Sequence, residues 1–331
     1  MKAVLIGCGT IARTHADVLN KTGIKIEAVC DIDMEAAERF CRAFCPSAEI
    51  YTDYKKMLDE IKPTVAHILT PHYLHAEMVC ETLKRQIHCL CEKPLYIKDG
   101  EYEMIKAALK YSKAKLGVCF QHRYVKTNCF IKQKIEEEGF LGMCASLMWH
   151  KDKAYYRSGE WRGKKETEGG ALLINQAIHF LDQILWLGGD AEYITANLAN
   201  HTLQDVIDTE ETAEIFIELK NKKFVQFYAT NGAIDNFNGQ ICLKTNKSCY
   251  EFNSKFIFAN GTLFDLQNNS LEINAKSYWG YGHLGLIKDF YDCIRNNREF
   301  EIGLKEASKA VELVLAAYRS EGKRVKIKNN L

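Results

Sequence analysis

The chain is short of proline, of long apolar runs and of net charge. Only four of its 331 residues are proline, 47% are hydrophobic and 26% are charged, which excludes disordered and collagen-like chains. Lys and Arg number 44 against 43 Asp and Glu, so no broad basic surface is available for nucleic acid or an anionic membrane. No apolar run reaches the ~18 residues of a membrane span, and the first apolar run ends at Gly7, too short for a signal peptide.

Cysteine is plentiful but does not form a metal-binding or disulfide pattern. The thirteen cysteines are odd in number, scattered, and without a CxxC pair. The closest spacings, Cys41 with Cys45 and Cys89 with Cys91, lack the partners that a zinc site needs. We therefore predict no metal site, reduced and buried thiols, and a cytoplasmic location.

The length favours two domains, each with its own core. Over residues 1–120, β-rich runs such as KAVLI, KIEAVC and HCLCE alternate with amphipathic helical segments. This alternation predicts βαβ crossovers and a doubly wound parallel sheet, an α/β Rossmann domain that binds a dinucleotide.

Over residues 121–331 the pattern changes to closely spaced strands with short connections, which suit antiparallel neighbours. We expect helices near residues 126–138, 284–296 and 304–320. The second domain is thus predicted to be α+β, with an open, mostly antiparallel sheet, and to serve in substrate binding and oligomerisation. One sheet face shows Phe216, Phe224 and Tyr228, either as a surface buried against a second subunit or as ordinary surface aromatics.

A GxGxxA pattern follows the first strand-like run and opens a helix. Gly7 permits a tight turn, Gly9 lets the backbone approach a pyrophosphate, and Ala12 allows close helix–strand packing. The helix is expected to begin near Ile11, so its free N–H groups and positive dipole face the phosphates. The pattern predicts a dinucleotide site.

Asp31 ends the second strand-like run, about twenty residues further on, where a carboxylate accepts from the ribose hydroxyls of an adenosine. An anion there repels a 2′-phosphate, and Ile32 offers no compensating cation, so we expect NAD rather than NADP. Capping of the next helix is the other role considered for Asp31, but Asp33 lies nearer the helix start.

Three further motifs follow strand-like runs, where open α/β sheets bind ligands. They are TPHYLH (residues 70–75), CEKP (residues 91–94) and FQHRY (residues 120–124). The Lys-Pro pair indicates a fixed turn that aims Lys93. For His72 and His75, cofactor contact and packing at a helix start both stay open.

The stretch GGALLINQAIHFLD, residues 169–182, predicts a buried helix. Asn175, His179 and Asp182 fall at i, i+4 and i+7, which places three polar groups on one stripe. His179 titrates near neutrality and suits an acid/base role, whereas Asp182 is expected to be structural, orienting His179 or pairing elsewhere.

In their order along the chain, these motifs and WRG at 161–163 resemble the glucose-fructose oxidoreductase, inositol dehydrogenase and MocA family. The resemblance covers essentially the whole chain. It implies a Rossmann domain, a larger open-faced α+β domain, and NAD(P)-dependent oxidation or reduction of sugars, polyols or their derivatives, commonly in a dimer or tetramer.

The resemblance also implies residue roles. Lys93 matches the EKP lysine, which contacts the nicotinamide region and the substrate hydroxyl, and His179 matches the histidine that serves as or assists the acid/base. Many members have Asp where this chain has Asn175, and an amide cannot accept a proton from imidazolium. His122 stands where similar members often have Asn.

We therefore predict an NAD-dependent oxidoreductase that transfers a hydride between nicotinamide and a secondary hydroxyl of a sugar, polyol or derivative. An NAD-retaining glycoside hydrolase and a non-catalytic dinucleotide sensor are the alternatives. The predicted catalytic residues are Lys93, His179 and Asn175. The predicted cofactor residues are Gly7, Gly9, Thr10, Ile11, Asp31, Thr70, Pro71, His75, Glu92 and Lys93. The predicted substrate residues are Lys93, Arg123, Tyr156, Trp161, Arg162, Asn175 and His179, although Tyr156, Trp161 and Arg162 also suit aromatic loop packing.

Overall fold

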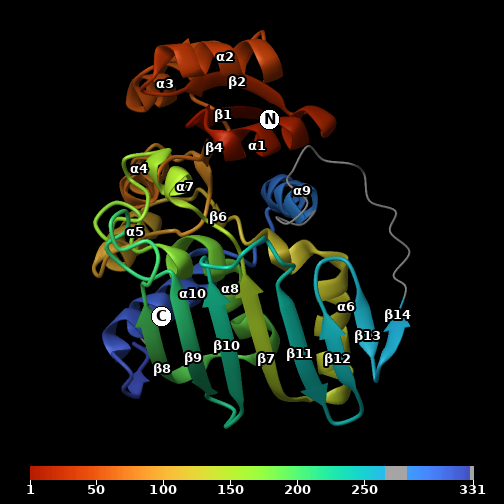
Figure 1. Cartoon of the computed structure of the whole chain (residues 1–331). Coiled ribbons are helices and arrows are strands. Elements are labelled where there is room, and N and C mark those ends of the chain that lie inside the picture. The colour runs from red at the N-terminus through yellow and green to blue at the C-terminus, as the bar shows by residue number, and fades with distance from the viewer. Residues whose placement is uncertain (265–281, 329–331) are drawn as a thin grey trace. The chain divides into compact units, whose positions relative to one another are not determined.

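A computed structural model describes residues 1–264 and 282–328 (Figure 1). The chain forms two compact units. The first contains residues 1–121 and the described residues 282–307, and the second contains the described residues of 122–264 and 308–328. In the described ranges, no helix combines the length and apolar character needed to cross a membrane.

The first unit is built on a six-stranded parallel sheet in the order β3-β2-β1-β4-β5-β6. Its strands are β1 (Lys2–Ile6), β2 (Lys25–Cys30), β3 (Glu49–Tyr51), β4 (Val65–Ile68), β5 (His88–Cys91) and β6 (Leu116–Val118). Its helices are α1 (Thr10–Lys21), α2 (Met34–Phe44), α3 (Tyr54–Ile61), α4 (His75–Lys84), α5 (Glu101–Lys110) and α9 (Gly282–Arg295). The order reverses between β1 and β4, which is the ligand crevice of a doubly wound sheet. The predicted Rossmann domain is confirmed.

The first unit also includes α9. The sequence predicts one domain boundary near residue 120, which would place α9 in the second domain. Gly117 in β6 explains the contact, because a Cβ there would lie 2.7 Å from the ring of Phe290. Phe290 and Tyr291 are fully buried, and the Phe290 ring packs edge-on against Phe300 with centroids 5.1 Å apart. Apolar packing of α9 on β6 therefore makes α9 part of the first unit, although α9 lies far from β6 along the chain.

The second unit is built on a nine-stranded sheet in the order β14-β13-β12-β11-β7-β10-β9-β8-β15. Its strands are β7 (Phe140–Met148), β8 (Ala191–Ala199), β9 (Thr212–Leu219), β10 (Phe224–Thr230), β11 (Gln240–Thr245), β12 (Cys249–Phe252), β13 (Ile257–Ala259), β14 (Thr262–Phe264) and β15 (Val325–Lys326). Its helices are α6 (Lys126–Glu138), α7 (Lys153–Arg157), α8 (Ile178–Gly188) and all but the first turn of α10 (Leu304–Ser320). Among the strands of the described residues, only the central β7 and β10 pair in parallel, so the predicted mostly antiparallel sheet is confirmed.

The two faces of this sheet differ in chemistry. Figure 1 shows α6 behind the strands, and α8 packs against β7. On β9, Ala213, Ile215 and Ile217 are buried. The intervening Phe216 is 37% exposed, and Phe224 on β10 is 53% exposed with its ring stacked on that of Phe216. The predicted alternation is confirmed, and one face keeps an aromatic surface.

All thirteen cysteines are free thiols, as expected. Eight are buried as expected and Cys8 is half-buried, but the expectation is wrong for four that are exposed on α6 and on the large sheet: Cys129, Cys144, Cys242 and Cys249.

Candidate active site

The loop after β1 lies against the end of β4. Gly7 has φ +97°, and a Cβ there would come within 2.7 Å of the carbonyl oxygen of Leu69. Only glycine suits both the positive φ and this close approach. Gly7 N–H also donates to Cys30 O at 2.8 Å, which ties the turn to β2. The sequence prediction for Gly7 thus has a clear structural reason.

The first turn of α1 has the features of an anion-binding helix N-terminus. Gly9 is the N-cap residue, no side chain caps the helix, and the first turn holds no acidic residue. A Cβ at Gly9 would meet nothing within 4 Å. The N–H groups that open α1 at Thr10 and Ile11 therefore keep the positive end of the helix dipole available for a pyrophosphate.

Asp31 lies at the end of β2, beside this loop. Its Oδ2 accepts from Cys8 N–H at 2.8 Å, and its Oδ1 accepts from Asp33 N–H at 3.0 Å. Asp33, not Asp31, caps α2 by accepting from Ala36 N–H at 3.2 Å. The capping role considered for Asp31 is thus taken by its neighbour, and the carboxylate of Asp31 is fixed next to the glycine loop.

The TPH and EKP segments are joined by His75. Its ring is fully buried, with Nδ1 2.6 Å from Pro94 O and Nε2 2.9 Å from Thr70 O. Burial lowers the pKa of His75, so the neutral ring donates one proton, and the shorter distance assigns it to Nδ1. His75 therefore donates to the turn that bears Lys93, whose bond to Pro94 is cis, while its Nε2 lies beside Thr70 at the end of β4. Pro71 lies in the same segment, and Lys93 is half-buried.

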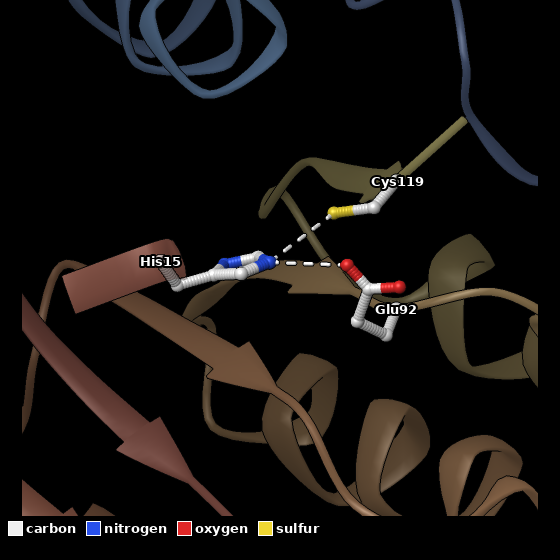
Figure 2. Close-up of side chains that lie close together, drawn as sticks. All are labelled: His15, Glu92 and Cys119. Atoms are coloured by element: carbon white, nitrogen blue, oxygen red, sulfur yellow. Dashed lines mark hydrogen bonds and ion pairs between the residues drawn. The ribbon is translucent and has the colours of Figure 1, made fainter. Parts of the chain in front are cut away.

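A buried polar cluster lies beneath Glu92. Figure 2 shows His15 Nε2 of α1 reaching Glu92 Oε1 at 3.1 Å and Cys119 Sγ at 4.0 Å. Behind it, His15 Nδ1 lies 2.8 Å from His67 Nδ1, and His67 Nε2 lies 2.9 Å from Tyr291 Oη. The side chains thus form a hydrogen-bonded row from α9 to the EKP turn.

The directions of the pKa shifts determine which group donates in each hydrogen bond of this row. Burial alone would raise the pKa of Glu92, but the hydrogen bond from His15 and the nearby ring of His283, whose Nε2 lies 3.8 Å from Oε1, outweigh burial and lower the pKa well below its usual value. Burial lowers the pKa of His15 and of His67, so both rings are neutral. The ionised carboxylate accepts from His15 Nε2–H, which then requires His67 Nδ1–H and Tyr291 O–H to donate in turn.

This cluster is also where a metal would find ligands. One donor atom each of His15, Glu92 and Cys119 lies within 4.8 Å of the others, and nitrogen, oxygen and sulfur donors suit zinc. Burial raises the pKa of the Cys119 thiol well above its usual value, which keeps it protonated. The hydrogen-bonded row accounts for the contact between His15 and Glu92 without an ion. Glu92 Oε2 also accepts weakly from Lys93 N–H at 3.3 Å, so the row supports the Lys93 turn.

In the second unit, His179 on α8 stacks on His122. Their ring centroids are 4.9 Å apart with an interplanar angle of 23°, and each residue is 9% exposed. One turn along, Asp182 receives both Nε–H and a terminal N–H of Arg123, at 2.9 and 2.7 Å. Both side chains of this pair are buried. Asp182 thus pairs with Arg123, one of the two roles expected for it, and the predicted substrate contact of Arg123 stays a prediction.

Asn175 does not share the α-helical register of His179. Residues Leu172–Ala177 form a π-helical segment, and the α-helix begins only at Ile178. The π segment changes the local helical register, and the alignment of Asn175 with His179 on one stripe stays a prediction. Its Nδ2 instead donates to Glu168 Oε1 at 2.5 Å and to Tyr155 Oη at 3.2 Å.

The remaining predicted substrate residues gather around Tyr155. Arg162 lies over the Tyr155 ring at 4.7 Å and the Trp161 ring at 4.6 Å, and donates to Tyr155 Oη at 2.8 Å. Tyr156 is 3% exposed, and its hydroxyl accepts from Asn231 Nδ2 at 2.8 Å. Sequence reasoning missed Tyr155 and Glu168 in this group, although Glu168 directly precedes the glycine pair that opens the helix.

Comparisons with known proteins agree with this architecture. The chain is 27% identical over 247 residues to glucose-6-phosphate 3-dehydrogenase of Bacillus subtilis, covering 70% of this chain and 68% of that protein. It is 27% identical over 248 residues to D-glucoside 3-dehydrogenase of Escherichia coli, covering 73% and 68%. Among solved structures, the WlbA dehydrogenase of Chromobacterium violaceum, in complex with NADH and UDP-GlcNAcA, has a TM-score of 0.87 at 23% identity, covering 100% of this chain and 97% of that one.

Two family models match the chain. Residues 1–120 match the model described as "Oxidoreductase family, NAD-binding Rossmann fold", and residues 132–328 match "Oxidoreductase family, C-terminal alpha/beta domain". The predicted resemblance is confirmed: the chain belongs to the glucose-fructose oxidoreductase, inositol dehydrogenase and MocA family of oxidoreductases.

Proposed function

We propose that this protein is an NAD-dependent dehydrogenase that acts on a secondary hydroxyl of a sugar, a polyol or a sugar derivative. The observation that carries the proposal is the glycine loop of the first unit. It joins an uncapped helix N-terminus to a carboxylate, Asp31, fixed by the N–H of Cys8. Phosphate and ribose groups of NAD match these two partners. An acidic side chain at this point disfavours the 2′-phosphate of NADP.

The reaction requires a hydride acceptor and a base for the hydroxyl proton. NAD, held by the glycine loop and Asp31, would supply the hydride acceptor for the carbinol carbon. We assign His179 to take the hydroxyl proton, and Lys93 to stabilise the negative charge that develops on the oxygen. The stacked ring of His122 restricts the orientation of His179. Joint action of Lys93 and His179 on one substrate is part of the proposal.

The substrate residues are proposed from the second unit. Asn175, Trp161 and Arg162 are partly exposed, so their polar and aromatic groups suit a hydroxylated ring. Tyr156 and Arg123 are buried more deeply. Tyr156 accepts from Asn231, and Arg123 donates to Asp182 on α8, so we assign both to supporting the substrate residues. Two relatives described above are sugar 3-dehydrogenases by name, which supports a carbohydrate substrate.

We further propose that the protein is a cytoplasmic homodimer or homotetramer, assembled through the open face of the large sheet. Phe216, Phe224 and Tyr228 are 37–53% exposed on adjacent strands of that face. Thirteen free thiols suit a reducing compartment. Replacing Phe224 by Glu should shift the protein to monomer in sedimentation, whereas an unchanged sedimentation coefficient would contradict this interface.

The activity is tested with purified protein and a panel of sugars, sugar phosphates and polyols. With NAD, at least one compound should produce stoichiometric NADH, and NADP should be used less well. An aryl glycoside in the same assay tests the alternative, because a hydrolase that retains NAD would release the phenol without net NADH. Failure of every compound to change nicotinamide absorbance would favour a non-catalytic sensor.

A further inference from the structure

The carboxylate of Glu168 faces the amide of Asn175 inside the second unit. Glu168 is fully buried. Its Oε2 accepts from the backbone N–H of Gly163, and its Oε1 accepts from Asn175 Nδ2. Gly163 has φ +70° and packs against Tyr156 and Ile207, so the loop that presents its N–H is tightly held.

The chemistry of the carboxylate decides which end of the amide faces it. Both oxygens of Glu168 accept, one from Gly163 N–H and one from Asn175 Nδ2, so the amide of Asn175 presents its nitrogen to Glu168. The second Nδ2 proton is directed at Tyr155 Oη, 3.2 Å away. Toward any other group Asn175 therefore offers only its oxygen, Oδ1, as an acceptor.

We propose that Glu168 is a positioning residue that orients Asn175 so that its amide oxygen accepts from the substrate hydroxyl. Residue 175 therefore still offers the substrate an oxygen acceptor, as an Asp there would. The carboxyl group, however, belongs to Glu168, which lies behind Asn175 and does not contact the substrate. This inference rests on the proposed function for its substrate but not for the orientation of the amide. It also assigns proton transfer to groups other than residue 175, since an amide cannot take the proton.

The test exchanges the two groups. In Glu168→Gln, the buried N–H of Gly163 still needs an acceptor, so the introduced amide turns its nitrogen toward Asn175, which must then present its own nitrogen outward. In Asn175→Asp, two carboxylates face each other, and one of them keeps a proton. In the double variant, the amide introduced at position 168 donates to the carboxylate introduced at position 175, and every partner is satisfied again. Glu166→Gln, an exposed site two residues away, is the control.

Each single variant should lower kcat/KM by about 10- to 100-fold, the value of one hydrogen bond to a charged or buried group. The double variant should recover about tenfold or more relative to either single variant, and Glu166→Gln should match wild type. Losses that simply multiply in the double variant would overturn the proposal, as would a Glu168→Gln variant with wild-type kcat/KM.

The pH profile separates positioning from a purely structural role. Only Asn175→Asp should gain an additional pKa above the ordinary range of a carboxyl group, and the double variant should lose it again. Burial raises the pKa of Tyr155 to about 12 and the pKa values of Tyr156 and Tyr318 further. Burial also raises the pKa of nearby Glu210, which accepts from Tyr318, but Glu210 is unchanged in all four proteins and cannot account for a difference between them.

The same four proteins are compared by chemical denaturation, which needs no substrate. Coupling between residues 168 and 175 in the free energy of unfolding supports the orientation of the amide even if no sugar or polyol is oxidised, in which case only the proposed function fails. Additive changes in unfolding free energy would refute the contact itself.

Discussion

Removing the carboxylate of Asp31 should weaken NAD binding about a hundredfold and leave the fold intact. In the structure, its two oxygens accept one backbone N–H each, from Cys8 and Asp33. A carboxylate has about four acceptor sites, so about two remain for the two hydroxyls of the adenosine ribose. At about 1.5 kcal/mol for each hydrogen bond to a charged group, Asp31→Ala loses about 3 kcal/mol, or roughly a hundredfold in Kd.

Asp33→Ala is the matched control, because Asp33 is an acid two residues away whose side chain caps α2. Its loss should lower the free energy of unfolding by about 1 kcal/mol and leave the Kd for NAD unchanged. The Kd values for NAD and NADP are measured by calorimetry for wild type and both variants. In Asp31→Ala, the preference for NAD over NADP should shrink, since the repulsion of a 2′-phosphate is removed. An unchanged Kd for NAD in Asp31→Ala, or an equal loss in Asp33→Ala, would refute the assignment.

Three other perturbations have defined outcomes. Lys93→Met and His179→Ala should each lower kcat by about 10²- to 10⁴-fold in a steady-state NADH assay, and wild-type turnover in both would exclude these roles. Asp182→Asn leaves its buried guanidinium partner without a carboxylate and should cost about 3–5 kcal/mol in denaturant unfolding, so a loss below about 1 kcal/mol would show that the pair is unimportant. His15→Leu removes a donor to ionised Glu92, whose pKa is lowered in the folded state, so this part of stability is present above the unfolded pKa of about 4.3 and is lost as pH falls through the folded pKa. The stability difference between wild type and His15→Leu should therefore be largest near neutrality and shrink on acidification. The lowered pKa of His15 adds to the same trend, because the unfolded chain binds a proton there that the folded chain does not. A difference independent of pH would argue against both lowered pKa values.

Most of the fold could be predicted because hydrophobic periodicity records which face of each element is buried. The strand-like runs of the first domain correspond to five of its strands, and the helix expected at residues 304–320 has those bounds. The strand β3 (Glu49–Tyr51) was not predicted, since three residues with little burial leave no period. The return of α9 to the Rossmann sheet depends on Phe290 meeting Gly117, a contact that no local pattern records.

Some residues of the candidate site could likewise be predicted from the sequence, and others could not. Residues at strand ends, such as Gly7, Asp31 and Lys93, could be predicted because sheet topology determines where strand ends meet. Glu168 could not, because a carboxylate within a polar loop resembles any solvated acid until the fold buries it. His15 lies within an amphipathic helix, where its burial against Glu92 depends on a residue 77 positions away.

The most direct test of the account is a crystal structure of the protein with NAD and a sugar or polyol that it oxidises. The account predicts that the hydroxyl oxygen at the reacting carbon lies within about 3.2 Å of both Lys93 Nζ and a ring nitrogen of His179. It also predicts that the carbon itself faces the nicotinamide. A reacting hydroxyl out of reach of either side chain would contradict the assignment of Lys93 and His179 to one catalytic step.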